Sequence, residues 1–394
     1  MNNKKWMAIL LGGIMAASLA APCSVSAAEK TTLTFWHAMG GTNGEVLQQI
    51  VDDFNASQDE IEIKAEYQGT YDDTITKLKA AMQSDSGLPD VCQMYDVGTK
   101  FMYDSGAVIP VEDKFESTGY DKSSVMDVIS SYYTVEGKQY AMPFNVSTPM
   151  LYYNKDVFEA AGLDPETPPT TYDEVLEDAK KIVESGAAPV GYSQAIYGWF
   201  FEQQLAGLGV TYGNNDNGRT EAVTAVDFDS NGGGLKVFDM WKKLYDSGYF
   251  EDYGTTTADT QTAFFSGQVG MIIESTAILK NAVDSSPFEV GTGYLPRIEQ
   301  NDEGGVIIGG GSLWLTDTGN EANEDAAWKF IEYITTPDVQ AKWSMGTGYF
   351  AINEKAYETD DMKAYLKENP NFETAINQLK DSPVNCNTAG VLSG

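Results

Sequence analysis

The sequence is poor in the residues that build disulfide frameworks and metal centres, because its 394 residues include only 3 cysteines and 1 histidine. Cys92 and Cys386 are the cysteines beyond the N-terminal segment discussed below, and they are too isolated for a disulfide framework. Neither belongs to a cysteine and histidine spacing typical of zinc sites. We therefore predict no metal site and no cofactor, and we expect a hydrophobic core to stabilise the fold.

Basic residues are also scarce. Lysine and arginine together number 25 against 58 aspartates and glutamates, which gives a net charge of -33. Such a chain is repelled by the phosphates of nucleic acids and by an anionic membrane surface. We therefore exclude nucleic acid as a partner and interpret the acidic residues as a solvated surface.

Long hydrophobic runs are missing except near the N-terminus. There, two lysines precede the apolar run of residues 7–21, and the small residues 24–28 offer a cleavage site. We predict that residues 1–28 are a signal peptide and that the protein is exported to the periplasm or to the outer face of the cytoplasmic membrane. Cys23 is an alternative site for a lipid anchor, although the proline before it fits a lipoprotein signal poorly.

What the sequence does contain is a repeated alternation of strand and helix patterns. Its length and its 42% hydrophobic residues predict two lobes. Strands are predicted at residues 32–36, 61–67 and 91–95, and helices with apolar faces at residues 46–54 and 75–82. This βαβαβ order predicts an α/β fold with mostly parallel sheets and covering helices.

Two further helices follow from capping and breaking signals. Thr171 and Glu174 are spaced as a capping box at the start of one helix. Apolar residues at 326–334 mark another, which ends near Thr336 because Pro337 cannot continue it. Since no long low-complexity linker separates these regions, short crossings must join the two lobes.

Seven stretches of the sequence together carry a family resemblance. They are LTFWHAMGG, YQGTYDD, QMYDVGT, PFNVSTPMLYYNKDVFEAAGLDPETPPTTYDE, FFSGQVGM, IIGGGSLWL and TGYFAIN, in this order. They resemble the extracytoplasmic solute-binding proteins (family 1) of ABC importers and, within this family, its glycerol-3-phosphate-binding members. The resemblance spans nearly the whole chain after the signal segment.

The resemblance implies a two-lobed fold of the periplasmic-binding type (type II), in which the chain crosses between the lobes several times. It implies lobe 1 at residues 29–142 and 289–340, and lobe 2 at residues 143–288 and 341–394. We expect the C-terminal part of lobe 2 to be incomplete. The crossings are expected at Pro143 to Tyr153, near residues 286–297, and after the helix that ends at Thr336.

The resemblance also implies a function without catalysis. The protein is expected to be a monomer that captures a small molecule in the cleft between its lobes. The expected ligand is glycerol 3-phosphate or a glycerophosphodiester, and the expected partner is the transmembrane permease of an ABC importer. We therefore expect no enzymatic activity.

The site residues follow from matching the family's motifs to this sequence. A bound polyol needs polar partners and aromatic faces, because a buried unpaired hydroxyl is costly. A glycine lets its backbone amide approach an anion. The predicted ligand-binding residues are Tyr71, Asp96, Ser147, Trp199, Ser275, Gly310 and Tyr349, together with Trp36 and His37 at the end of the first strand. Five of them keep structural interpretations as well: Asp96 as a helix cap, His37 as a hydrogen-bonding core residue, Tyr71 and Tyr349 as half-buried surface aromatics, and Gly310 as part of a tight turn.

The sequence departs from the family's pattern at three places. Asp96 replaces a glutamate and reaches less far, and Ile196 replaces one of two wall tryptophans, for which Tyr197 is a substitute. The family's phosphate-pairing arginine is expected beyond the last residue, and the two arginines present, Arg219 and Arg297, lie outside the ligand motifs. Because arginine is the natural partner of phosphate, a neutral sugar or oligosaccharide stays open as the ligand.

A secreted glycoside hydrolase is the alternative from a different class. Such an enzyme needs two carboxyl groups at the scissile bond, and an acidic chain offers many pairs. No such pair stands in a recognisable catalytic motif, and the sequence has no P-loop and no nucleophile elbow. The motifs therefore favour a binding protein over an enzyme.

Overall fold

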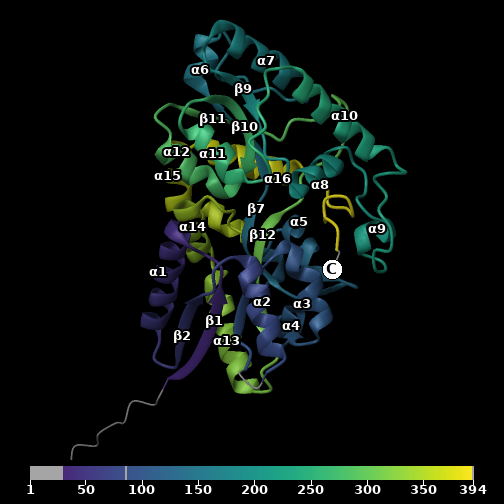
Figure 1. Ribbon diagram of the computed structural model, residues 1–394. Helices are drawn as coiled ribbons and strands as arrows, with labels where there is room; N and C mark the ends of the chain where they lie inside the picture. The colour runs from purple at the N-terminus through teal and green to yellow at the C-terminus, as the bar shows by residue number, and fades with distance from the viewer. Residues whose placement is uncertain (1–29, 85–86, 393–394) are drawn as a thin grey trace, which may run out of the picture.

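The computed structural model describes residues 30–84 and 87–392. These residues form two α/β lobes, one above the other in Figure 1, each built around its own sheet. The predicted two-lobed α/β fold is thereby confirmed. The predicted signal peptide, residues 1–28 with Cys23, lies outside the described residues.

The lower lobe contains the predicted βαβαβ unit. Strands β1 (Thr31–His37), β2 (Ile61–Tyr67) and β3 (Val91–Tyr95) pair in parallel, in the order β2-β1-β3. Helices α1 (Gly41–Ser57) and α2 (Tyr71–Met82) connect them. The apolar positions that predicted α1 are the ones it buries: Leu47, Ile50, Val51 and Phe54.

The rest of the lower sheet is antiparallel, as are most strand pairings of the upper sheet described below, so the prediction of mostly parallel sheets is wrong for both lobes. Strand β12 (Gly309–Thr316) runs antiparallel to β3, to β4 (Val108–Ile109) and to β7 (Met142–Ser147). The physical reason is that β12 returns from the upper lobe and enters this sheet from the cleft, in the opposite direction to β3. Its pairing therefore needs no helical crossover of the βαβ kind.

The remaining elements of the lower lobe flank this sheet. They are α3 (Thr99–Ser105), α4 (Val111–Thr118), α5 (Asp127–Ser130), the hairpin of β5 (Thr134–Val135) and β6 (Lys138–Gln139), α13 (Glu321–Ile334) and α14 (Pro337–Thr347). Helix α13 ends before Pro337 as predicted, and this proline then begins α14, where its missing N–H is harmless.

The upper lobe is built around a four-stranded sheet in the order β11-β8-β10-β9. Its strands are β8 (Pro149–Asn154), β9 (Val190–Ser193), β10 (Val269–Ser275) and β11 (Val290–Gly293), and only β9 and β10 pair in parallel. The helices around it and at the lobe boundary are α6 (Lys155–Ala160), α7 (Tyr172–Ser185), α8 (Gly198–Gly207), α9 (Asn214–Gly218), α10 (Gly233–Asp246), α11 (Thr257–Phe265), α12 (Leu279–Ser285), α15 (Asp360–Glu368) and α16 (Asn371–Asp381). The predicted capping box of Thr171 and Glu174 starts α7.

Strand pairing locates the passages between the two sheets. Only Thr148 separates β7 in the lower sheet from β8 in the upper one, and both strands are fully buried. Strand β11 still pairs with β8, so the chain returns to the lower sheet within residues 294–308. The domain bounds given above stay a prediction, with the addition that residues 290–293 belong to the upper sheet.

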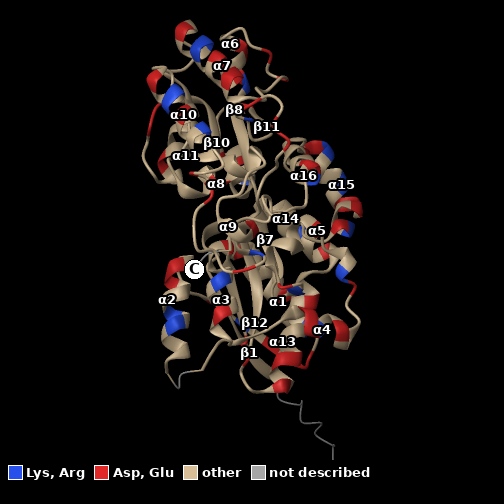
Figure 2. Cartoon of the chain, turned by 90° about the vertical axis from the view of Figure 1, so that its right-hand side faces the viewer, with Lys and Arg blue, Asp and Glu red and all other residues tan. Residues whose placement is uncertain are grey.

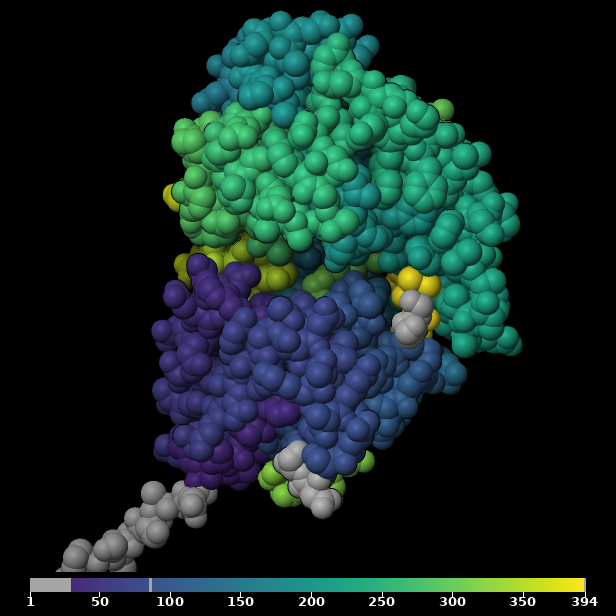
Figure 3. Space-filling view, viewed as in Figure 1, coloured from purple at the N-terminus to yellow at the C-terminus, as the bar shows by residue number. Residues whose placement is uncertain are grey.

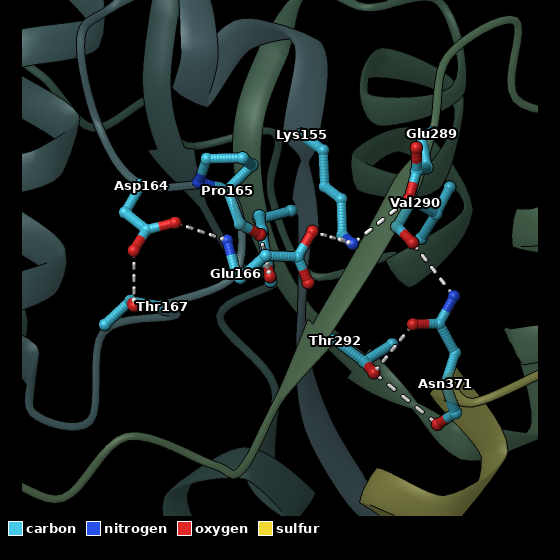
Figure 4. Close-up of polar contacts among 10 residues, drawn as sticks. Lys155, Asp164, Pro165, Glu166, Thr167, Glu289, Val290, Thr292 and Asn371 are labelled. Atoms are coloured by element: carbon cyan, nitrogen blue, oxygen red, sulfur yellow. Dashed lines mark hydrogen bonds and ion pairs between the residues drawn. The ribbon is translucent and has the colours of Figure 1, made fainter.

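Polar contacts fasten the late helix α16 to the upper sheet. Asn371 donates to a carbonyl of β11 at 2.9 Å and accepts from the Thr292 hydroxyl at 3.2 Å. Nearby, Lys155 pairs with Glu166 at 2.8 Å and with Glu289 at 3.0 Å (Figure 4). The first residue of α16 is therefore held by the upper lobe.

Acidic residues are spread over the outer helices of both lobes (Figure 2). This arrangement agrees with the solvated acidic surface inferred from the composition. Within residues 30–84 and 87–392, no helix combines the length and the apolar character needed to cross a membrane.

Candidate functional site: a cavity between the lobes

A cavity of about 490 Å³ lies where the two lobes meet, and a furrow between them is visible in the space-filling view (Figure 3). It opens at the carboxyl ends of β3, β7 and β10 and at the beginning of β12, where strand ends leave room for side chains. Its lining residues are Tyr71, Tyr95, Asp96, Val97, Tyr132, Ser147, Tyr197, Gly198, Trp199, Glu202, Tyr212, Thr257, Glu274, Ser275, Gly309, Gly310 and Val391.

Most of the predicted ligand-binding residues meet in this cavity. The residues that line it are Tyr71, Asp96, Ser147, Trp199, Ser275 and Gly310. Tyr349 lies just behind the lining, while Trp36 and His37 lie elsewhere in the lower lobe. The structure thus brings distant segments of the sequence together, and the binding role of each residue stays a prediction.

Tyr71 is held by a buried hydrogen-bond network. Asn145 on β7 donates to the Tyr71 hydroxyl at 2.8 Å, and Gln93 on β3 donates to Asn145 at 2.6 Å. The Tyr71 ring stacks on Tyr95, with centroids 5.0 Å apart and an interplanar angle of 7°. Burial raises the pKa of Tyr71 well above its ordinary value, so its hydroxyl stays protonated.

Tyr349 belongs to the same network from the other side. Asn145 also forms a side-chain hydrogen bond with Tyr349. The Tyr349 ring stacks on Trp343 of α14, with centroids 5.6 Å apart and an interplanar angle of 6°. Asn145 therefore joins two tyrosines that are far apart in sequence, and it is fully buried.

Asp96 begins the short 3₁₀ helix Asp96–Gly98, directly after β3. Burial, followed by the nearby Glu202, raises its pKa to about 7. The backbone N–H groups of Asp96 and Val97 act in the opposite direction by donating to the carboxylate. The residue thus combines the predicted helix-start position with a place in the cavity wall.

Two further carboxylates line the cavity and were not predicted. Burial raises the pKa of Glu202 to about 6, although Glu202 accepts a hydrogen bond from the Val391 N–H at 2.7 Å. Burial also raises the pKa of Glu274, which accepts from Gln261 at 2.9 Å. Among the cavity-lining residues that the structure describes, none is lysine, arginine or histidine.

The two serines differ in how far their hydroxyls are already engaged. Ser275 caps the helical turn Thr276–Ile278, because its hydroxyl accepts from the Ala277 N–H at 3.1 Å. Ser147 is 3% exposed. Its hydroxyl has no hydrogen-bond partner within the described part of the chain, so it is free to bind a ligand.

Gly310 is required by the approach of a neighbouring strand. Its φ is +92°, and a Cβ there would lie 1.9 Å from the carbonyl oxygen of Asn145. At Gly309 a Cβ would lie 2.8 Å from the Trp199 ring. These glycines let β7 and the tryptophan close the cavity wall, which is a packing reason for the run of glycines in the sequence.

The aromatic wall of the upper lobe comes from the start of α8. The Trp199 indole N–H is buried and has no partner among the described residues. Tyr197 lines the cavity rim and is 45% exposed, whereas Ile196 faces a separate groove beside α10. The position expected to carry a second wall tryptophan therefore does not face the cavity, and Tyr197 takes its place.

Trp36 and His37 have other surroundings. Trp36 donates to Glu66 at 3.0 Å near the surface of the lower lobe. His37 is 6% exposed, and burial lowers its pKa to about 4, which leaves it neutral at physiological pH. Its buried position fits a core residue, although its Nδ1 has no hydrogen-bond partner among the described residues.

Two missed residues could have been found from local periodicity. Asn145 lies two positions before Ser147, and residues i and i+2 of a strand share a face. Glu202 lies three positions after Trp199, one turn along the same helix. Tyr132 and Val391 come from segments that carry no motif.

The comparison with protein families identifies the chain. The model of the bacterial extracellular solute-binding proteins matches residues 49–374. The chain belongs to this family. Its relatives include UgpB, the sn-glycerol-3-phosphate-binding periplasmic protein, of Brucella abortus (strain 2308). That relative is 33% identical over 390 residues, which cover 97% of this chain and 89% of the relative. UgpB of Escherichia coli (strain K12) is 31% identical over 360 residues, with coverage of 90% and 81%.

Solved structures share the fold. UgpB from Mycobacterium tuberculosis in complex with glycerophosphocholine matches with a TM-score of 0.79 and 23% identity, covering 90% of this chain and 87% of that one. The cyclic alpha-maltosyl-1,6-maltose binding protein from Arthrobacter globiformis matches with a TM-score of 0.75 and 26% identity, with coverage of 91% and 89%. The predicted class is confirmed: the chain is a solute-binding protein of an ABC importer.

Proposed function

We propose that the chain captures a glycerol phosphate ester, either glycerol 3-phosphate or a glycerophosphodiester, and delivers it unchanged to a membrane permease. The observation that carries this proposal is that both lobes contribute hydroxyls and aromatic rings to one cavity of about 490 Å³, a size suited to a small ligand. Contacts to both lobes favour the closed form over the open one. The ligand named for the UgpB relatives supports the ligand class.

The charges of the cavity favour a diester over a monoester. Asp96, Glu202 and Glu274 line it without a basic side chain among the described lining residues. Repulsion grows with the charge of the ligand. A phosphodiester carries one negative charge, whereas a phosphomonoester at neutral pH carries nearly two. The glycerophosphocholine complex of the M. tuberculosis protein, which shares the fold, agrees with this preference.

A neutral sugar is the second candidate, because the same lack of a basic side chain suits an uncharged ligand. Sugar hydroxyls donate readily to carboxylates, and their CH faces pack on aromatic rings. The likeness to the Arthrobacter maltosyl-maltose binding protein agrees with it.

We also propose that the protein acts outside the cytoplasmic membrane as a monomer and performs no chemistry on its ligand. The periplasmic location named for its UgpB relatives supports the export predicted from the N-terminal sequence.

Calorimetric titration with glycerophosphocholine, glycerol 3-phosphate, glycerol and maltose tests the proposal. We expect the diester to bind most tightly, the monoester more weakly, and glycerol and maltose not at all. Trp199→Ala should weaken binding about thirtyfold, whereas the control Tyr245→Ala, on an exposed face of α10 outside the cavity, should bind as the wild type does. Heat with maltose alone would favour the sugar instead, and turnover of any ligand would contradict a purely binding role.

A further inference from the structure

The last described segment, residues 385–392, lies between the two lobes beside the cavity and is named the strap here. Its atoms appear in yellow in the gap at the right of Figure 3. The backbone N–H of Val391 donates to Glu202 at 2.7 Å, and both residues line the cavity. The N–H of Leu392 donates to the carbonyl of Asn217 at 2.8 Å. The upper lobe therefore holds the strap as part of the cavity wall.

One side chain, Arg219, joins the strap to the lower lobe. Its Nη1 donates to the carbonyl of Tyr132 at 2.7 Å, and its Nη2 donates to the carbonyl of Gly390 at 3.0 Å. Its Nη2 also donates to the carbonyl of Ala389. The guanidinium lies 5.0 Å from the centre of the Tyr132 ring, in cation–π geometry.

The direction of Arg219 is set by an unusual turn. Asn215, Asp216 and Asn217 have φ values of 56°, 54° and 58°, a left-handed conformation that residues other than glycine rarely adopt. The Asn217 side chain accepts from the N–H groups of Tyr212 at 2.8 Å and Gly213 at 2.9 Å. Such strain persists only where the surroundings fix it, and it is often linked to function.

The chemistry of Arg219 indicates a mechanical role. All its hydrogen bonds within the described residues go to backbone carbonyls, so its guanidinium is not available to bind a ligand bidentately. Its charge acts on Glu202, whose pKa it lowers against the effect of burial. A charge withdrawn from water is costly unless hydrogen bonds and opposite charges compensate it, and Arg219 is compensated by backbone carbonyls and by Glu202.

We propose that Arg219 is a positioning residue that latches the upper lobe and the strap to Tyr132 of the lower lobe, and so sets how far the cleft is closed and how tightly it binds. This inference rests on the proposed function only in that the cavity is taken as the ligand site. A latch that raises the closed population lowers the apparent dissociation constant by the same factor.

The test uses the full chain with Arg219→Gln and Arg219→Lys, and Arg297→Gln as the matched control. Arg297 is exposed, and its side chain makes no hydrogen bond or ion pair with the described residues, although its charge acts on Asp302. Without ligand, we expect both Arg219 variants to show a larger radius of gyration in solution scattering and faster amide exchange at Val391 and Leu392. With glycerophosphocholine, we expect affinity to fall about tenfold for Arg219→Gln and less for Arg219→Lys, while Arg297→Gln behaves as wild type.

The outcomes separate the two proposals. If the wild type binds no phosphate ester, the proposed function fails, but scattering and exchange still decide the latch. Wild-type scattering and exchange in both Arg219 variants would overturn the latch, as would the same changes in Arg297→Gln. If Arg219→Gln does not fold, Arg219→Lys decides alone, because it keeps the charge and loses the forked contacts.

Discussion

The lower wall and the upper wall of the cavity are built differently. In the lower wall, Asn145 bonds to Tyr71 and Tyr349, and Tyr71 stacks on Tyr95. In the upper wall, the Trp199 indole N–H has no partner among the described residues, and Tyr197 is 45% exposed. These polar groups of the lower wall are therefore already paired with one another, whereas the upper wall contains a polar group that is still unpaired.

This difference separates stability from affinity. Buried groups that satisfy one another support the fold, and removing one leaves its partners unpaired. A buried donor without a partner lowers stability rather than supporting it, and the aromatic rings of the upper wall line the cavity, where they can contact a ligand. We therefore expect changes in the lower wall to affect unfolding and binding together, and changes in the upper wall to affect mainly binding.

The largest effect is expected for Asn145→Ala in the lower wall. It leaves buried groups of Gln93 and Tyr71 without partners, which should lower the free energy of unfolding by about 2 to 4 kcal/mol. Urea unfolding followed by circular dichroism measures this. Asn281→Ala, at an exposed position of α12, is the control and should stay within about 0.5 kcal/mol of wild type. An equal effect of both variants would refute the inference that the paired polar groups of the lower wall stabilise the fold.

The next largest effect is expected for Trp199→Ala in the upper wall. Loss of its ring and N–H should weaken ligand binding by about 2 kcal/mol, or roughly thirtyfold, with a smaller change in unfolding. Tyr71→Ala should differ by lowering both, because Asn145 then loses an acceptor. Calorimetry and urea unfolding on the same samples give both numbers. If Trp199→Ala lowered the free energy of unfolding more than the free energy of binding, the inference that the upper wall serves mainly binding would be wrong.

How much of the site was visible in the sequence depends on how each residue is placed. Tyr71, Asp96, Ser147 and Ser275 stand at strand or helix ends inside recognisable motifs, so their meeting in one cavity could be predicted. Glu202 could not be predicted from charge, because the chain has 58 acidic residues; only its spacing from Trp199 and its burial single it out.

The fold shows the same limit. The parallel unit β1, β2 and β3 follows from local periodicity, whereas the antiparallel pairing of β12 follows from the direction in which the chain returns from the other lobe. No local pattern records that direction. Tyr132 and the strap reach the cavity through tertiary contacts with Arg219, which a single sequence does not reveal.

A smaller, pH-dependent effect is expected for Asp96→Asn. The folded pKa of Asp96, about 7, lies above the ordinary value of 3.8, so the folded state holds an extra proton between these values. Wild-type stability therefore falls as pH rises from about 4 to about 7, and this contribution is absent from the variant. Since the carboxylate is partly exposed to the cavity, we expect the variant to gain only about 1 to 2 kcal/mol over wild type between pH 5 and pH 8.

Thermal unfolding at a series of pH values measures this difference. Val97→Ala, which changes the exposed neighbour of Asp96 and no titratable group, is the control and should show no such trend. A gap between Asp96→Asn and wild type that stays constant from pH 5 to pH 8 would show that Asp96 titrates normally.

The smallest effects are expected at the two serines. There, the lower-wall residue should affect only binding, and the upper-wall residue should affect stability as well. Ser147 lies on the lower side, yet its hydroxyl has no partner among the described residues, so Ser147→Ala should weaken binding about fivefold, near 1 kcal/mol, without lowering stability. Ser275 lies on the upper side but caps a helical turn, so Ser275→Ala should lower stability by about 1 kcal/mol as well. Calorimetry with urea unfolding checks both. If Ser147→Ala alone lost stability, the lobe that carries a residue, and not whether its side chain already has a hydrogen-bond partner, would decide whether a substitution lowers the free energy of unfolding.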